Sequence, residues 1–190
     1  MDTETLTDFM TRDLKTRRFF KGVFPRNLLP SQLESESLYV INLSAVTDTS
    51  EKEQGGSHWV LLSTLSSPYY SAYICSLGQK PTHKNIIDSL FSVSDCIVYS
   101  NFKNQGDLTT VCGYHVVWTG AMLSRGHNLL DIMTSFFTES TYINDHAVVE
   151  IISTNFNIQE LIPISDWKFI LTGQGVTNGC ERKKFCKKKK

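Results

Sequence analysis

The chain has 190 residues, of which 41% are hydrophobic and 11% aromatic, and its nineteen basic side chains equal its nineteen acidic ones in number. This length and composition predict one soluble globular domain that buries a core without disulfide staples. The sequence excludes two classes: no apolar run reaches the length of a membrane span, and the acidic start at 1–4 does not resemble a secretion signal. The five cysteines, an odd number, favour an intracellular monomer with reduced thiols.

The charge is distributed unevenly along the chain. The last ten residues carry seven Lys or Arg against one Glu, a local charge of +6, and the first 180 residues carry −6. We therefore expect a single domain over 1–172 and a flexible basic tail over 173–190. Such a tail makes DNA a candidate partner. The residues that would contact it are Arg182, Lys183, Lys184, Lys187, Lys188, Lys189 and Lys190.

Hydrophobic periodicity predicts the elements in chain order. The predicted helices are 2–15, 82–92, one beginning near Cys112, 129–137 and 146–156. The predicted strands are 38–43, 58–65, 69–75 and 96–100. Leu14 should lie on the apolar face of the first helix, Thr82 should cap the second, and 17–30 should be an ordered loop. The fold class is then α+β, a small, mostly antiparallel sheet flanked by helices, with 58–65 and 69–75 as a hairpin.

The segment 109–118 predicts a helix with Cys112 in its first turn. Thr109 and Thr110 are candidate N-caps. The helix dipole at that position favours the thiolate, which is the nucleophilic form of cysteine. The alternative is a structural role, because free cysteine is among the most buried residue types.

Two other residues complete the parts of a thiol acyl-transfer site. His58 begins an apolar strand and is a candidate base, and Gln105, seven residues before Cys112, is a candidate donor to an oxyanion. His115 is a rival base, but one helical turn from Cys112 it would point along the flank of the helix. The alternative for each histidine is a structural role. The spacing of Cys and His predicts no metal site.

In order and spacing, three segments resemble the adenovirus-type maturation cysteine proteases, which are relatives of the SUMO-deconjugating proteases. These segments are Gly56-Ser57-His58-Trp59-Val60, Tyr73-Ile74-Cys75-Ser76-Leu77-Gly78, and Gln105 followed by Cys112-Gly113. The segment 20–30, Phe-Lys-Gly-Val-Phe-Pro-Arg-Asn-Leu-Leu-Pro, is similar to the versions found in virophages and Maverick/Polinton elements. The resemblance spans residues 17–125.

The resemblance implies a papain-like, adenain-like fold with the nucleophile at a helix N-terminus. It also implies an endopeptidase that cleaves viral capsid precursors at Gly-containing sites during virion maturation. Cys112 would be the nucleophile and His58 the base and then the acid, with Gln105 and the backbone N–H of Cys112 in the oxyanion hole. Trp59 would line the cleft. The expected location is the virion and the host cell interior, either cytoplasm or viral factory, and not outside the cell.

The sequence departs from the family pattern at the third catalytic position. The family has Asp, Glu or Asn at the end of the strand that follows the histidine, and this chain has Cys75 there. A thiol supplies little of the charge that orients an imidazolium. Three explanations stay open: a Cys–His dyad, which we favour; a ring oriented by Ser76 or by water; or a chain with weakened catalysis.

The tail carries a second hypothesis that follows from the resemblance. Residues 171–175, Leu-Thr-Gly-Gln-Gly, fit the cleavage preference of the family. A cut between Gln174 and Gly175 would release a basic peptide beginning Gly-Val, like the family's activating peptide. We hypothesise that this peptide acts in cis, with Cys186 or Cys180 bridging to Cys96. No cofactor is required by the sequence, so DNA and this peptide are the candidates, and a nucleic-acid-binding or solubilising tail is the alternative.

Two other functions stay open. The first is a deconjugase of a ubiquitin-like modifier, in which Trp59 would line the channel for the Gly-Gly terminus. The second is an inactive DNA- or capsid-binding protein, which Cys75 motivates.

Overall fold

The computed structural model describes residues 1–45, 58–136 and 139–157. Within these residues the chain forms five α-helices and five strands, together with two short 3-10 turns. The elements are α1 (Thr3–Arg12), β1 (Phe20–Pro25), β2 (Leu38–Asn42), β3 (Trp59–Ser63), β4 (Ser71–Ile74), α2 (Lys84–Phe91), β5 (Ile97–Tyr99), α3 (Cys112–Leu123), α4 (Leu129–Thr134) and α5 (Thr141–Asn157). The α+β class predicted from the sequence is therefore confirmed.

The five strands form one mixed sheet in the order β1-β2-β3-β4-β5. The pairs β2–β3 and β3–β4 are antiparallel, which confirms the predicted hairpin. The pairs β1–β2 and β4–β5 are parallel, so the prediction of a mostly antiparallel sheet is wrong.

The first parallel pair arises because β1 forms within 17–30, which was predicted as a loop. An edge strand tolerates the glycine and the proline that suggested a loop. Gly22 has a φ of +137° and lies where the β1–β2 register shifts, and Pro25 ends the strand.

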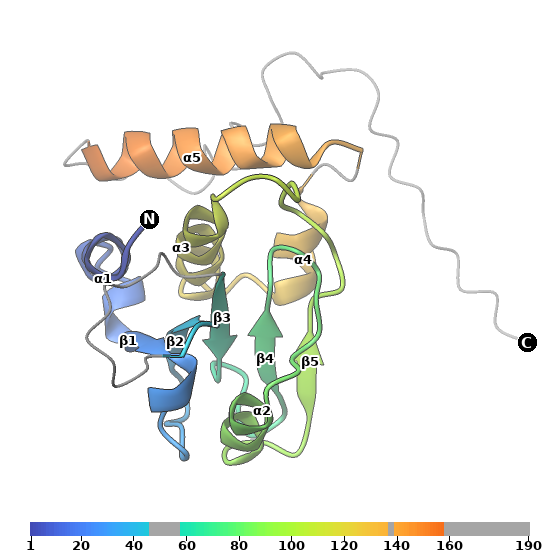
Figure 1. The fold of residues 1–190 in the computed structure, drawn as a ribbon. Coiled ribbons are helices and arrows are strands. Elements are labelled where there is room, and N and C mark those ends of the chain that lie inside the picture. The colour runs from blue at the N-terminus through green and yellow to red at the C-terminus, as the bar shows by residue number, and fades with distance from the viewer. Residues whose placement is uncertain (46–57, 137–138, 158–190) are drawn as a thin grey trace, which may run out of the picture.

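Helices cover both faces of the sheet (Figure 1). The three central strands β2, β3 and β4 are buried between them, apart from Asn42 at the end of β2. Leu38 and Val40 of β2 point to the face that packs against α1, α3, α4 and α5. Tyr39 and Ile41 of the same strand point to the other face, where α2 packs. Strands buried on both faces carry continuous apolar sequence, which is the pattern of β2 and β3.

Helix α3 is the centre of the larger core. Ten of its twelve residues are buried, and it contacts β3, α1, α4 and α5. Its sequence is apolar around the whole circumference, as expected for a helix with no solvent face. In Figure 1, α5 crosses the end of α3 at which Cys112 begins the helix. The position of this helix start is therefore fixed by packing on several sides.

Four predicted helix boundaries are wrong. Helix α4 ends at Thr134, three residues before the predicted end. Helix α1 ends at Arg12, and Leu14 beyond it is 64% exposed, because Asp13 leaves the helical conformation to enter a buried ion pair. Helix α2 has His83 as its N-cap in place of Thr82, with no side-chain capping bond. Helix α5 begins at Thr141, five residues before the predicted start.

The ion pair between Asp13 and Arg125 fastens α1 to the C-terminal end of α3. Arg125 Nη1 and Nη2 donate to the two Asp13 oxygens at 2.5 Å and 2.9 Å, and both side chains are buried. Burial raises the pKa of Asp13, but hydrogen bonds from Arg125 and Thr16 outweigh it and hold the pKa below its ordinary value. The carboxylate is therefore charged in the folded protein.

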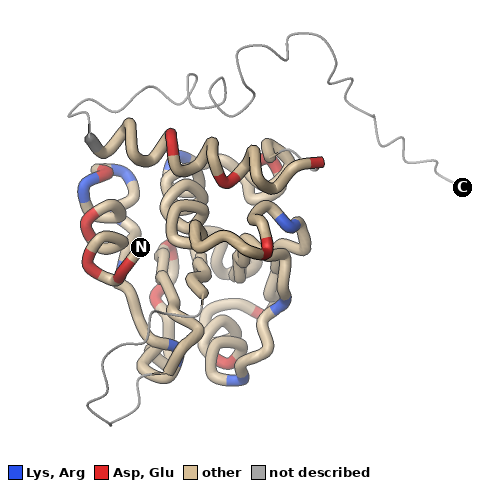
Figure 2. The backbone as a smooth tube through the Cα atoms, turned by 45° about the horizontal axis from the view of Figure 1, so that its top comes forward, with Lys and Arg blue, Asp and Glu red and all other residues tan. Residues whose placement is uncertain are grey.

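The described residues include no helix that is both long and apolar enough to cross a membrane. Their charged side chains are mixed, with both signs scattered along the backbone (Figure 2). The predicted domain boundary at 172 and the basic tail over 173–190 lie outside the described residues.

We expect Arg125→Ala to lower the free energy of unfolding by about 3–5 kcal/mol, because it leaves the Asp13 carboxylate buried without its partner. The matched control is Arg12→Ala, which removes an exposed i,i+4 pair with Asp8 and should cost less than about 0.5 kcal/mol. Urea unfolding at neutral pH measures both. Equal losses in the two variants would contradict this account of the buried pair.

Candidate active site

Cys112 is the first residue of α3, as the sequence predicts. The N-cap is Val111, which makes no side-chain capping bond, so the predicted Thr110 or Thr109 cap is wrong. Thr109 Oγ1 bonds instead to Asp145 Oδ2 at 2.8 Å and to the Gly106 carbonyl at 3.0 Å. The threonine thus shapes the loop before the helix, while backbone N–H groups face the sulfur.

The Cys112 side chain is 7% exposed and its sulfur is a free thiol. Burial raises the pKa of the Cys112 thiol, while the backbone N–H groups of Trp59 and Gly113 act in the opposite direction. The N–H groups at the helix start thus favour the thiolate, as expected, but burial outweighs them and the net shift favours the thiol. The influence of the Trp59 N–H places the sulfur beside the residue that follows His58.

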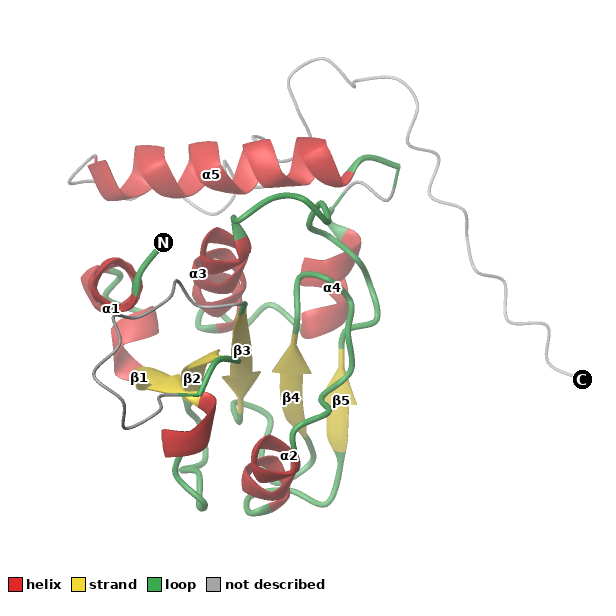
Figure 3. Cartoon of the chain, viewed as in Figure 1, coloured by secondary structure: helices red, strands yellow, loops and turns green. Residues whose placement is uncertain are grey.

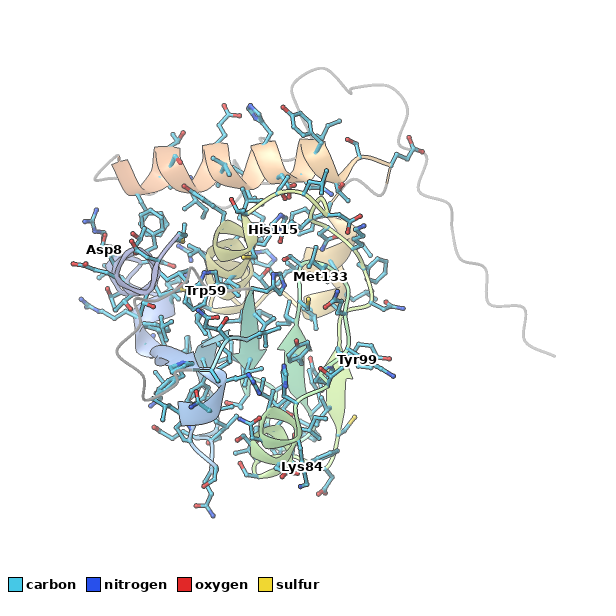
Figure 4. All side chains as sticks on the ribbon, in the orientation of Figure 1. Asp8, Trp59, Lys84, Tyr99, His115 and Met133 are labelled. Atoms are coloured by element: carbon cyan, nitrogen blue, oxygen red, sulfur yellow. The ribbon has the colours of Figure 1, made fainter. Side chains whose placement is uncertain are left out.

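Met1 covers the same end of α3. Its carbonyl accepts a hydrogen bond from Trp59 Nε1 at 3.1 Å. Its side chain packs against Gly113 so closely that a Cβ there would lie 2.9 Å from the Met1 sulfur. Trp59 itself lies beside α3 (Figure 4). A molecule that reaches Cys112 from this side has to displace or pass Met1.

His58 lies immediately before β3 and is 8% exposed. Its Nε2 is 3.3 Å from the sulfur of Cys75, which follows β4. Burial lowers the pKa of His58, and the nearby His115 lowers it further. The imidazole is therefore uncharged at neutral pH, which is the form that can accept a proton.

Gln105 lies in the loop between β5 and α3 (green in Figure 3) and is 2% exposed. Ser76 Oγ donates to its Oε1 at 2.6 Å, and its Nε2 donates to the Thr109 carbonyl at 2.8 Å. These two bonds fix which way the amide faces, and one N–H of the amide remains for another acceptor. The proton of the Ser76 hydroxyl is thus engaged with Gln105, while its oxygen can still accept a hydrogen bond.

Asp145 is a residue of this site that sequence reasoning missed. Its Oδ2 accepts from the Gly106 N–H at 3.0 Å and from Thr109 Oγ1, and its Oδ1 lies 2.9 Å from His115 Nε2. Burial raises the pKa of Asp145, but hydrogen bonds from His115, Gly106 and Thr109 outweigh it and lower the pKa. Asp145 therefore ties α5 to the loop that carries Gln105.

A signal for Asp145 exists in the sequence. On α5 it lies three residues before Val148 and seven before Ile152, both of which are fully buried, so a carboxylate falls on the apolar face of the helix. Such a buried charge needs a partner. The partner is His115, which lines an internal cavity with Met133 between α3 and α4 (Figure 4). An imidazole held by a carboxylate at one ring nitrogen can still act as a base at the other, so His115 stays a rival base.

The remaining predicted residues are dispersed. Cys96 is an exposed free thiol just before β5. Gln174, Gly175, Cys180 and Cys186 lie outside the described residues, as do the family-like Gly56 and Ser57. Among the residues that the structure describes, no group of three or more His, Cys, Asp or Glu side chains is placed to hold a metal ion.

No model of a known protein family matches the chain, and no curated protein matches it either. The chemistry of the site therefore has to be argued from its own residues.

We expect Asp145→Asn to lower the free energy of unfolding by about 3 kcal/mol at neutral pH, because an amide cannot replace a carboxylate that accepts from three donors. The folded pKa of Asp145 is depressed, so its contribution should be full above the unfolded pKa of about 3.9 and lost as the pH falls through the folded pKa. The variant should lack that acid-sensitive component. Glu150→Gln, an exposed change on the same helix, is the control, and an equal loss there would contradict the assignment.

Proposed function

We propose that this protein is a cysteine endopeptidase in which Cys112 is the nucleophile and His58 the general base. One observation carries the proposal. The thiol of Cys112, at the start of α3, lies against the backbone N–H of Trp59. Trp59 follows the buried imidazole of His58 in the sequence. The loop before this helix holds the amide of Gln105 in a fixed orientation. Thiol, base and amide donor are the components of thiol acyl transfer.

The reaction starts from a neutral pair, because burial raises the pKa of the Cys112 thiol and lowers that of His58. His58 takes the thiol proton as the sulfur attacks the scissile carbonyl, and it returns the proton to the leaving amine. Negative charge then develops on the carbonyl oxygen. The free N–H of Gln105 and the backbone N–H of Cys112 are the donors proposed to stabilise it. Water hydrolyses the resulting thioester in the second half of the reaction.

The substrate assignment within this proposal rests on the resemblance to the adenovirus-type maturation proteases. Capsid precursor proteins cut at Gly-containing sites during virion maturation are the proposed substrates. The tail hypothesis belongs to the same proposal: Gln174–Gly175 as a self-cleavage site, Cys186 or Cys180 bridging to Cys96, and DNA bound by the basic residues over 182–190. The exposure of Cys96 is compatible with such a bridge.

We expect wild-type protein to cleave a peptide containing Leu-Thr-Gly-Gln-Gly-Val, and Cys112→Ala to leave it intact. Mass spectrometry of the products, with and without DNA, reads out the cut. Cys96→Ser, which removes a thiol far less buried than that of Cys112, is the control and should keep the basal rate without DNA or added peptide. Cleavage that persists in Cys112→Ala would sink the assignment of the nucleophile.

We expect Gln105→Ala to lower kcat by about 10²–10³, the usual cost of one oxyanion donor. Ser76→Ala should cost about tenfold, because the amide of Gln105 loses the bond that fixes its orientation. Ser100→Ala is a matched buried serine whose hydroxyl accepts from the Phe102 N–H, away from Gln105. Unequal kcat values for Ser76→Ala and Ser100→Ala are the expected result, and equal values would contradict the positioning role of Ser76.

A second candidate function is an inactive binding protein, and the burial of Cys112 favours it. A thiol with a raised pKa beneath Met1 is what a structural cysteine would show. Iodoacetamide distinguishes the two functions. A thiol activated by His58 should be alkylated faster in wild type than in His58→Gln at the same pH, whereas a structural thiol should not react in the folded protein.

A further inference from the structure

The sulfur of Cys75 lies in a tight turn that directs donors towards it. Cys75 follows β4, and its carbonyl accepts from the Gly78 N–H at 2.9 Å, with Gly78 at a φ of +69°. Burial raises the pKa of the Cys75 thiol, and the backbone N–H groups of Gln79, Leu77 and Gly78 act in the opposite direction. The Gly78 N–H is bonded to the Cys75 carbonyl, and the N–H groups of Leu77 and Gln79 are the other backbone donors of the turn that favour an anionic sulfur.

His58 Nε2 contacts this sulfur at 3.3 Å. A neutral thiol has one proton to donate and accepts weakly. With backbone donors facing the sulfur, the acceptor within reach of the thiol proton is Nε2. When Nε2 accepts that proton, the proton of the neutral imidazole must be on Nδ1. Under the proposed function, Nδ1 is the ring nitrogen that has to accept the Cys112 proton, and in this tautomer it cannot accept one.

We propose that Cys75 is the positioning residue for His58, and that the site gains its base when the Cys75–His58 pair loses one proton. In the inactive form the sulfur carries a proton that points to Nε2, and Nδ1 carries the other. Release of one proton to solvent water leaves a Cys75 thiolate that accepts from Nε2–H. The Nδ1 lone pair is then free to accept the Cys112 proton. No electrons are transferred.

This inference rests on the proposed function, because it deepens the role of the same site. A carboxylate at this position would be charged at any pH above about 4 and would hold Nε2–H permanently. In the Ser-His-Asp template, loss of the carboxylate that fixes the tautomer lowers kcat by about 10⁴. Cys75 supplies the same acceptor only at a pH where its thiol ionises. The protein is then active at alkaline pH, because Cys75, the positioning residue, orients His58 only after it has lost its proton.

Other titratable groups face this pair, and each has a defined place. Cys112 and His115 belong to α3, and His115 is held by Asp145. Tyr73 of β4 is the nearest phenol on the Cys75 side, and burial raises its pKa, so it stays neutral. The amino terminus acts on Cys112. Within 1–45, 58–136 and 139–157, none of these groups contributes a negative charge next to Nε2, and Cys75 is the group in contact with it.

The direct test is the tautomer of His58 in the full-length wild-type protein. We expect ¹⁵N-edited NMR of the imidazole to show Nδ1–H at pH 7 and Nε2–H at alkaline pH, with His58→Gln used to assign the signals. A ring that already carries Nε2–H at pH 7 and does not change on raising the pH would overturn the proposal. This measurement needs no substrate and no variant of Cys75.

Two variants extend the test to reactivity. Cys75→Asp supplies a permanent anion, so the alkylation of Cys112 and peptide cleavage should both reach their plateau at a lower pH than in wild type. The rate of each protein should rise with pH and then level off. Where the variant has levelled off and wild type is still rising, the variant should be faster by about tenfold for each pH unit below the wild-type plateau. Cys75→Ser keeps the size of the side chain without an ionisable thiol, so its cleavage should show no alkaline gain. A Cys96→Ser background and peptide mass spectrometry restrict the alkylation signal to Cys112.

The outcomes separate this proposal from the proposed function. Peptide cleavage with identical pH profiles in wild type, Cys75→Asp and Cys75→Ser would leave the protease in place and reject the role of Cys75. The expected change of His58 tautomer without any peptide cleavage would support the role of Cys75 and reject the protease. If Cys75→Asp does not fold, the wild-type tautomer and the Cys75→Ser profile decide the question.

Discussion

The site depends on the packing of α3 against β3. Because ten of the twelve residues of α3 are buried, the helix has almost no freedom to slide or rotate. Its first residue, Cys112, is thereby held at the end of the sheet where Trp59 begins β3 and where His58 precedes it. The fold thus builds a site at the ends of rigid elements, and the ion pair of Asp13 with Arg125 fastens the far end of the same helix.

The turn that follows β4 contacts both His58 and Gln105. Cys75 contacts His58 through its sulfur, and the adjacent Ser76 donates to the amide of Gln105. The Ser76 carbonyl also accepts from the backbone N–H groups of Asn104 and Gln105. The proposed base and the proposed oxyanion donor are therefore contacted by neighbouring residues, and a change in the conformation of this turn would move both. Asp145 holds the other end of the Gln105 loop from α5.

Burial sets the electrostatic character of the site. It raises the pKa of the Cys112 and Cys75 thiols and lowers that of His58, so all three groups tend towards their neutral forms. Backbone N–H groups oppose burial at both sulfurs. A site of this kind resists adventitious ionisation, so the proposed reaction would depend on proton transfer as the sulfur attacks. The number of protons on the Cys75–His58 pair also matters in that proposal, since no hydrogen bond between a carboxylate and the ring is found among the residues that the structure describes.

The sequence by itself determined the α+β class, the central hairpin and the helix that begins at Cys112, because buried strands and a buried helix leave continuous apolar runs. Apolar periodicity does not encode strand direction. Only the tertiary structure decided that, at the two edges of the sheet, β1 pairs in parallel with β2 and β5 pairs in parallel with β4. Side-chain partners such as Cys75 with His58, Ser76 with Gln105 and Asp145 with His115 join residues 17, 29 and 30 positions apart. These partners follow from how the elements pack. The pKa of the Cys112 thiol also depends on packing, because the burial that raises it, against the effect of the helix start, comes from the folded core.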